Sequence, residues 1–157
     1  MEIHNIPPVF DENSKILILG SFPSVKSRET EFFYGHPQNR FWKVLSAITN
    51  ENVPQTIEEK RNFLLRNNIA VWDVIQSCDI HGSSDSSIKN VIPNDISKIT
   101  STADIKQIYT NGTTAHKLYL KYIGKDAIKL PSTSPANAAY SLERLIKEWK
   151  CLIQASS

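Results

Sequence analysis

The 157-residue sequence has few residues of the types that build disulfide networks and metal sites. Its two cysteines, Cys78 and Cys151, are too few for a dense disulfide framework or for a four-cysteine iron–sulfur cluster. We therefore expect two reduced thiols and no iron–sulfur cluster. The four histidines show no metal-ligand spacing with each other or with the cysteines, so we also expect no metal.

Long apolar runs, glycine-rich loops and a strong excess of one charge are also missing. No apolar run approaches the ~20 residues of a membrane-spanning helix, and the first residues carry no basic stretch followed by an apolar core. We therefore expect a cytoplasmic protein without a membrane partner. The lack of a glycine-rich phosphate loop argues against a nucleoside-triphosphate enzyme. The net charge of +2 permits a nucleic-acid partner without requiring one.

The residues that are present are typical of a soluble globular domain. Hydrophobic residues make up 40% of the chain and charged residues 22%, and the length fits one domain over 1–157. Pro7 and Pro8 exclude a helix near the start, so residues 1–15 are expected to form an irregular arm. No exposed apolar heptad is evident, which favours a monomer.

Strand-like and helix-like segments alternate along the chain. Short apolar segments predict buried strands at 16–19, 69–75, 105–109 and 127–130. Caps and apolar periodicity predict helices at about 38–49, 56–67, 94–101, 113–122 and 138–154. Residues 76–92 are rich in serine and aspartate and are expected to form a loop. The alternation predicts a layered α/β fold with a mostly parallel sheet.

The densest cluster of candidate functional residues lies between positions 16 and 45. The first predicted strand ends in the sequence GSFPS (20–24), where Gly20 and Pro23 fit a sharp turn. A polar segment then leads to the sequence YGHPQNRFW (34–42). Because ligands bind just beyond the carboxyl ends of strands in parallel sheets, this cluster lies where a site is expected.

These two sequences resemble motifs of the uracil-DNA glycosylase superfamily, and more narrowly of the hypoxanthine (deoxyinosine) DNA glycosylases. The sequence LPSTSPAN (130–137) is similar to the second signature loop of that superfamily. The matching stretches occur in the expected order and bracket most of the chain. The resemblance implies a three-layer α/β sandwich with a central, mostly parallel four-stranded sheet, and no cofactor.

The activity that the resemblance implies is base excision repair. Such an enzyme hydrolyses the N-glycosidic bond of a deaminated base in DNA, here most simply hypoxanthine from deoxyinosine. No lysine lies in either motif, so we expect a monofunctional glycosylase without a Schiff-base intermediate. Uracil or xanthine as the excised base remains an alternative, as does action on free nucleosides. A non-catalytic module that binds damaged DNA is a further alternative, because Phe22 and Ser132 replace stronger polar groups of the relatives.

The resemblance also assigns roles to individual residues. The catalytic residue is Asn39, whose amide oxygen would accept a hydrogen bond from the attacking water; otherwise it would be an ordinary helix-start asparagine. The base pocket is expected to contain Gly20, Ser21, Phe22, Tyr34 and Asn111. The DNA-binding loops are expected to contain Pro23, Ser24, Ser132, Thr133, Ser134 and Pro135. The candidates for phosphate contacts are Lys26, Arg28 and Arg40.

Several of these assignments compete with structural roles. Phe22 would line the pocket or pack beneath the loop, and either Tyr34 or its neighbour Phe33 would stack on the base. Asn111 would read the Watson–Crick edge of the base or form an ordinary Asn-Gly turn. In addition, one aspartate after the second predicted strand could face the site. The candidates are Asp73, Asp79 and Asp85.

Overall fold

The centre of the fold is a four-stranded sheet with the strand order β3-β2-β6-β7. In a computed structural model of the chain, the described residues are 2–3, 6–22, 27, 29, 32–79 and 88–156. The four strands are β2 (Ile16–Gly20), β3 (Ile69–Asp73), β6 (Gln107–Asn111) and β7 (Ala127–Leu130). All three strand pairings are parallel, which confirms the predicted α/β fold with its central parallel sheet.

Burial explains why these strands could be predicted from the sequence. Every residue of β2 and β3 is buried, so the polar–apolar alternation of a half-exposed strand is absent there. The edge strand β7 is more exposed, and 46% of Ile128 is accessible to solvent. The strand β2 lies between β3 and β6, so Gly20 at its carboxyl end lies between the carboxyl ends of those two strands.

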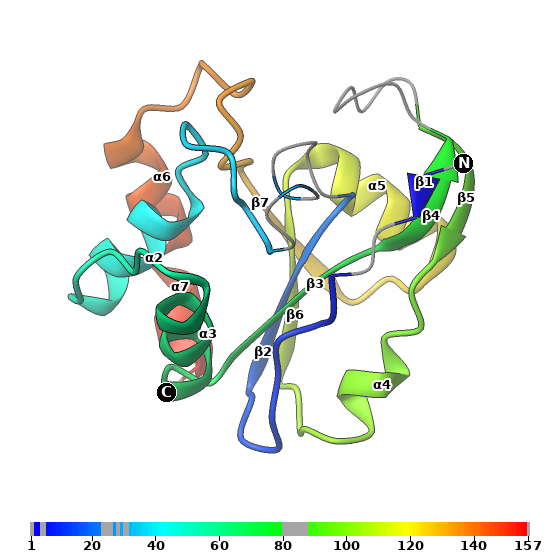
Figure 1. Cartoon of the computed structure of the whole chain (residues 1–157), viewed down its shortest axis with the longest axis horizontal. Helices are drawn as coiled ribbons and strands as arrows, with labels where there is room; N and C mark the ends of the chain where they lie inside the picture. Colours follow the sequence, from blue (N-terminus) through cyan, green and yellow to red (C-terminus); the bar gives the residue numbers. More distant parts are fainter. Residues whose placement is uncertain are drawn as a thin grey trace.

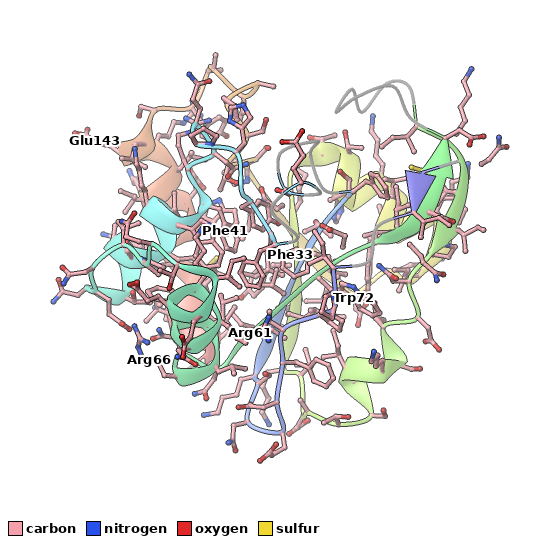
Figure 2. All side chains as sticks on the ribbon, in the orientation of Figure 1. Phe33, Phe41, Arg61, Arg66, Trp72 and Glu143 are labelled. Carbon is pink, nitrogen blue, oxygen red and sulfur yellow. The ribbon has the colours of Figure 1, made fainter. Side chains whose placement is uncertain are left out.

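Helices cover both faces of this sheet (Figure 1). One side carries α2 (Phe41–Thr49), α3 (Ile57–Arg66), α6 (Leu142–Trp149) and α7 (Cys151–Ser156). The other side carries α5 (Thr113–Tyr122), which packs on β6 and β7. Figure 2 shows Phe33 and Phe41 between the first group of helices and the sheet. The ring of Phe41 meets Trp149 of α6 edge-on, with 5.9 Å between the ring centroids.

Two helices begin where their sequences predict. The hydroxyl of Thr56 accepts a hydrogen bond from the backbone N–H of Glu59 at 3.0 Å, so the predicted cap starts α3. The helix α5 has the predicted bounds, and the amide of Gly124 donates to the carbonyl of Tyr119 just after its end.

A second, antiparallel sheet with the order β1-β4-β5 was not predicted. It contains β1 (Glu2–Ile3), β4 (Ile75–Asp79) and β5 (Lys89–Pro93). The prediction of a loop over 76–92 is therefore wrong for its two ends. The strand β5 has the sequence KNVIP and is mostly exposed, so its apolar residues do not form the buried run that reveals β2 and β3. The predicted strand 69–75 is also divided at Val74, whose amide donates to the carbonyl of Gly20 at 2.8 Å.

Three predicted boundaries are corrected by local hydrogen bonds. The helix α2 begins at Phe41 rather than at 38, because residues 36–39 form a turn in which the amide of Asn39 donates to the carbonyl of His36. The predicted last helix, 138–154, is divided into α6, which begins at Leu142 with the hydroxyl of Ser141 as its cap, and α7, which begins at Cys151. The third strand lies two residues later than predicted, at Gln107–Asn111.

The short helix α4 (Ser97–Thr100) begins three residues after the predicted start at 94, and Ile96 occupies its N-cap. The carboxylate of Asp95 accepts a hydrogen bond from the amide of Ser97 at 3.1 Å. The side chain of Asn94 instead donates to the backbone carbonyl of Asp73 at 2.9 Å. Asn94 therefore holds the end of β3 in place. Within the described residues, no helix combines the length and apolar character needed to cross a membrane.

Candidate active site

A pocket of about 930 Å3 opens at the carboxyl ends of the central strands. Its lining contains nine of the predicted site residues, which are Gly20, Ser21, Phe22, Tyr34, Asn39, Asn111, Ser132, Thr133 and Ser134. Pro135 and Arg40 are not part of the lining. The predicted residues Pro23, Ser24, Lys26 and Arg28 lie outside the described residues. The fold thus brings the two sequence motifs together around one cavity.

Gly20 leaves room for two polar groups at the floor of this pocket. Gly20 is paired with Asp73 at the ends of β2 and β3. A Cβ atom on Gly20 would overlap with Oδ1 of Asp73 and would lie 3.1 Å from the hydroxyl oxygen of Tyr34. A glycine is therefore required here because the carboxylate and the phenol occupy the space of a side chain.

Three aromatic side chains of the pocket wall, those of Phe22, Phe33 and Tyr34, differ in how deeply they are buried. Phe33 is 2% exposed and Phe22 is 9% exposed, so both belong to the core beneath the loop as well as to the pocket wall. Tyr34 has a left-handed backbone with a φ of 52° and stacks on Phe41 with 3.9 Å between ring centroids. The contact of Tyr34 with an extruded base stays a prediction; its stack on Phe41 fixes the orientation of the ring.

The hydroxyl of Tyr34 is a buried donor inside the pocket. It has no hydrogen-bond partner of normal geometry among the described residues. Burial raises the pKa of this hydroxyl far above its usual value, and the nearby charge of Asp73 acts in the same direction. Tyr34 therefore stays neutral and keeps its proton for a ligand in the pocket.

The orientation of the Asn39 amide follows from its two hydrogen bonds. Its Oδ1 accepts from the backbone N–H of Phe41 at 3.0 Å and from the hydroxyl of Thr133 at 2.8 Å. A backbone N–H can only donate, so the oxygen must face Phe41. Both acceptor sites of the oxygen are occupied, which differs from the predicted contact between this oxygen and water. The NH2 group of Asn39 is left as a donor that has no acceptor among the described residues.

Thr133 connects the two motifs. Thr133 is fully buried. Its hydroxyl oxygen accepts a hydrogen bond from the NH2 group of Asn111 at 3.0 Å, and its backbone N–H donates to Oδ1 of Asn111 at 3.1 Å. Asn111 is thus bound to the second loop, and its contact with a base edge stays a prediction. Gly112 has a φ of 97°, and a Cβ atom there would lie 2.9 Å from Cβ of Ser132.

Arg40 holds the second loop through backbone carbonyls. Its guanidinium donates to Ser134 at 2.8 Å, to Asn137 at 3.1 Å and, at its other end, to Tyr140. The Nε atom and the backbone amide of Arg40 donate to the carbonyl of Thr133 at 3.4 and 3.0 Å. These bonds give Arg40 a positioning role that the sequence did not reveal. Its phosphate contact stays a prediction.

Replacing Arg40 with methionine is expected to lower the free energy of unfolding by about 2–3 kcal/mol, because hydrogen bonds from a charged donor to half-buried carbonyls are lost together. Urea unfolding would measure the loss. Arg144→Met is the matched control, because Arg144 lies on an exposed surface over the ring of Tyr140. Equal losses for the two variants would contradict the positioning role.

Of the two candidate aspartates within the described residues, Asp73 lines the pocket and Asp79 does not. It is 4% exposed, and burial raises the pKa of its carboxyl group to about 7. Asp79 binds the side chain of Asn90 in the antiparallel sheet, and Asp85 lies outside the described residues. The sequence contained the signal, an aspartate directly after a buried strand, but could not select among the three.

The charges around the rim of the pocket include Lys129 on β7 and Glu148 on α6, which are both exposed. In the described part of the chain, no three histidine, cysteine, aspartate or glutamate side chains come together as ligands for a cation. The expectation that the protein uses no metal stays a prediction.

The parallel sheet, the glycine at the end of β2 and the two loops that meet at Thr133 are the features of a known class. The sequence profile of the uracil DNA glycosylase superfamily matches residues 7–154, and the chain belongs to this superfamily.

Individual relatives within the superfamily cover nearly the whole chain. A protein of Methanosarcina acetivorans called hypoxanthine DNA glycosylase is 36% identical over 152 residues, which are 94% of this chain and 96% of the relative. A protein of Methanosarcina barkeri with the same name is 36% identical over 141 residues, or 87% and 89% of the two chains. A solution NMR structure from Methanosarcina acetivorans, provisionally described as a uracil DNA glycosylase, superposes with a TM-score of 0.83 at 34% identity and covers 99% of each chain.

Proposed function

We propose that the protein is a monofunctional DNA glycosylase that releases hypoxanthine from deoxyinosine in DNA. The observation that carries the proposal is the Asn39 amide, whose oxygen is fixed by Phe41 and Thr133 so that its NH2 group remains as a donor. The relatives named hypoxanthine DNA glycosylase support the choice of base. We further infer that the enzyme acts as a cytoplasmic monomer on DNA that contains a deaminated base.

The pocket has the size and polarity for an extruded nucleotide. Its volume of about 930 Å3 lies in the upper range of small-ligand sites. Extrusion of the nucleotide costs a few kcal/mol and costs least for a mispaired base. Hypoxanthine carries a carbonyl oxygen and ring nitrogens that accept hydrogen bonds. The NH2 group of Asn39 and the hydroxyl of Tyr34 are donors that match these acceptors.

The bond between sugar and base then breaks through an oxocarbenium-like transition state. Negative charge develops on the departing base, and neutral donors held in fixed orientations stabilise that charge. Asn39 is such a donor, since its orientation is set by hydrogen bonds from two different parts of the chain. Its proposed catalytic role is therefore to hold the base as it leaves.

The test is a strand-cleavage assay on labelled duplexes that each carry one hypoxanthine, uracil, xanthine or normal base. We expect cleavage at hypoxanthine, and only after alkali has opened the abasic site. Cleavage at uracil alone would keep the superfamily and overturn the proposed base. Release from free deoxyinosine but not from DNA would point to a nucleosidase. Tight binding without release of any base would favour the damage-binding module.

Borohydride added during the reaction tests the monofunctional mechanism. Lys129 lines the pocket but is exposed rather than desolvated, so we expect no Schiff base between it and the sugar. A covalent adduct between protein and DNA would contradict this expectation, and a Lys129→Ala variant would show whether this lysine had formed it.

A further inference from the structure

Asp73 is held rigidly at the floor of the pocket. It is the last residue of β3 and pairs with Gly20, the last residue of β2. Its backbone carbonyl accepts a hydrogen bond from the side chain of Asn94 at 2.9 Å, and the next amide, that of Val74, donates to Gly20 at 2.8 Å. The carboxylate therefore occupies the space that the missing side chain of Gly20 leaves open.

Hydrolysis requires a group that accepts a proton from the attacking water. The amide oxygen of Asn39 is not available, because Phe41 and Thr133 fill its two acceptor positions. The hydroxyl of Thr133 is itself used between Asn111 and Asn39. An acceptor must therefore come from elsewhere in the pocket.

The described pocket lining contains two carboxylates, those of Asp73 and Glu148. Glu148 is exposed on α6 at the rim, where bulk water surrounds it. Asp73 is 4% exposed and lies at the floor, beside the hydroxyl of Tyr34. Its depth and fixed backbone make it the carboxylate that can bind one ordered water against a ligand in the pocket.

We propose that Asp73 binds the attacking water and takes its proton. The inference rests on the proposed function. The water oxygen forms the new bond to the sugar carbon while the bond from that carbon to the base nitrogen breaks, and its electron pair leaves with the base. The water proton passes to the Asp73 carboxylate. The departing base takes up one proton, either directly from Asp73 or from solvent while Asp73 releases its proton to solvent, so the enzyme returns to its starting state without any co-reactant.

The surroundings of Asp73 make its charge state sensitive to pH near neutrality. Burial alone raises the pKa of its carboxyl group to about 7. The titratable group that faces it from the 32–40 segment is the hydroxyl of Tyr34, which stays neutral. At the ends of the neighbouring strands β2 and β6, the pocket residues Gly20 and Asn111 carry no charge, and neither does Ser21, which follows β2. A base with a pKa near the working pH is the most effective one.

The experiment measures single-turnover release of hypoxanthine from a duplex between pH 5.5 and pH 9, together with the Kd for the same duplex. We expect the wild-type rate to rise about tenfold per pH unit below pH 7 and then to level off. Asp73→Asn is expected to be roughly 100-fold slower at pH 8, within the usual range for removal of a general base. Its pH profile should be flat and its Kd no weaker than that of the wild type. The matched control, Asp79→Asn, should keep the wild-type rate and profile.

The outcomes separate the inference from the function on which it rests. A wild-type rate that is independent of pH would overturn the role of Asp73, and so would an Asp73→Asn variant that is as fast as the wild type. In both cases the glycosylase activity would stand. If the wild type released no base at any pH, the proposed function would fail, and the inference with it. A purely structural Asp73 would change stability without removing the pH dependence.

Discussion

Replacing Asn39 with alanine is expected to slow the release of hypoxanthine by roughly 10²–10³-fold, the usual loss when one fixed donor to a developing negative charge is removed. The variant loses the NH2 group that is proposed to hold the departing base. It also leaves the amide of Phe41 and the hydroxyl of Thr133 without their acceptor. Single-turnover rates on the hypoxanthine duplex would measure the effect.

Asn39→Asp separates the two functions of this side chain. The aspartate keeps an oxygen for Phe41 and Thr133, so its free energy of unfolding should stay closer to that of the wild type than the alanine variant's does. It lacks the NH2 group, so base release should be as slow as in Asn39→Ala. Gln38→Ala, at the exposed neighbouring position, is the control for both assays. An active Asn39→Asp enzyme would show that the oxygen, not the NH2 group, matters.

Replacing Asp73 with asparagine is expected to stabilise the protein above pH 7. The unfolded chain releases the Asp73 proton with a pKa near 3.8, whereas the folded chain retains it up to about 7. Between these values the folded state binds more protons, so its stability falls as pH rises. At about 1.4 kcal/mol per pKa unit, ionisation of Asp73 in the folded protein costs up to about 4 kcal/mol of stability. The expected gain in stability of Asp73→Asn is this amount less the cost of burying the replacement amide.

Urea unfolding of wild type and Asp73→Asn at pH 4, pH 6 and pH 8 would test this expectation. The difference in the free energy of unfolding should be small at pH 4, should grow through pH 6 and should reach its full size at pH 8. Other carboxyl groups titrate equally in both proteins and cancel in the difference. A difference that does not change with pH would mean that Asp73 ionises in the folded protein as it does in water.

The rate measurements and the unfolding measurements on Asp73→Asn both depend on the free-energy cost of ionising a buried carboxyl group. Burial makes the ionised form of this carboxyl group costly, so its charge destabilises the fold near neutral pH. Proteins keep such groups where activity depends on them, so a variant that gains stability while it loses base release is the expected combination. Asp73→Asn combines both effects in one side chain.

Local patterns predicted much of the fold. The unbroken apolar runs of β2 and β3 appear in the sequence because both strands are fully buried. The bounds of α5 and the cap of α3 follow from residues within a few positions of each helix end. The antiparallel sheet was missed because β5 is mostly exposed and its pairing with β4 is irregular, with register shifts along the pair.

The sequence by itself determined the parallel α/β architecture, the superfamily and the group of residues from which the pocket is built. It could do so because burial, caps and short motifs are encoded among neighbouring residues. Only the tertiary structure decided what individual side chains do. Arg40 binds carbonyls that lie 93 to 100 positions away, and the oxygen of Asn39 is filled by Thr133, 94 positions away. Asp73, rather than Asp79, lines the pocket because β3 ends beside a glycine, and contacts over such distances leave no local pattern in a sequence.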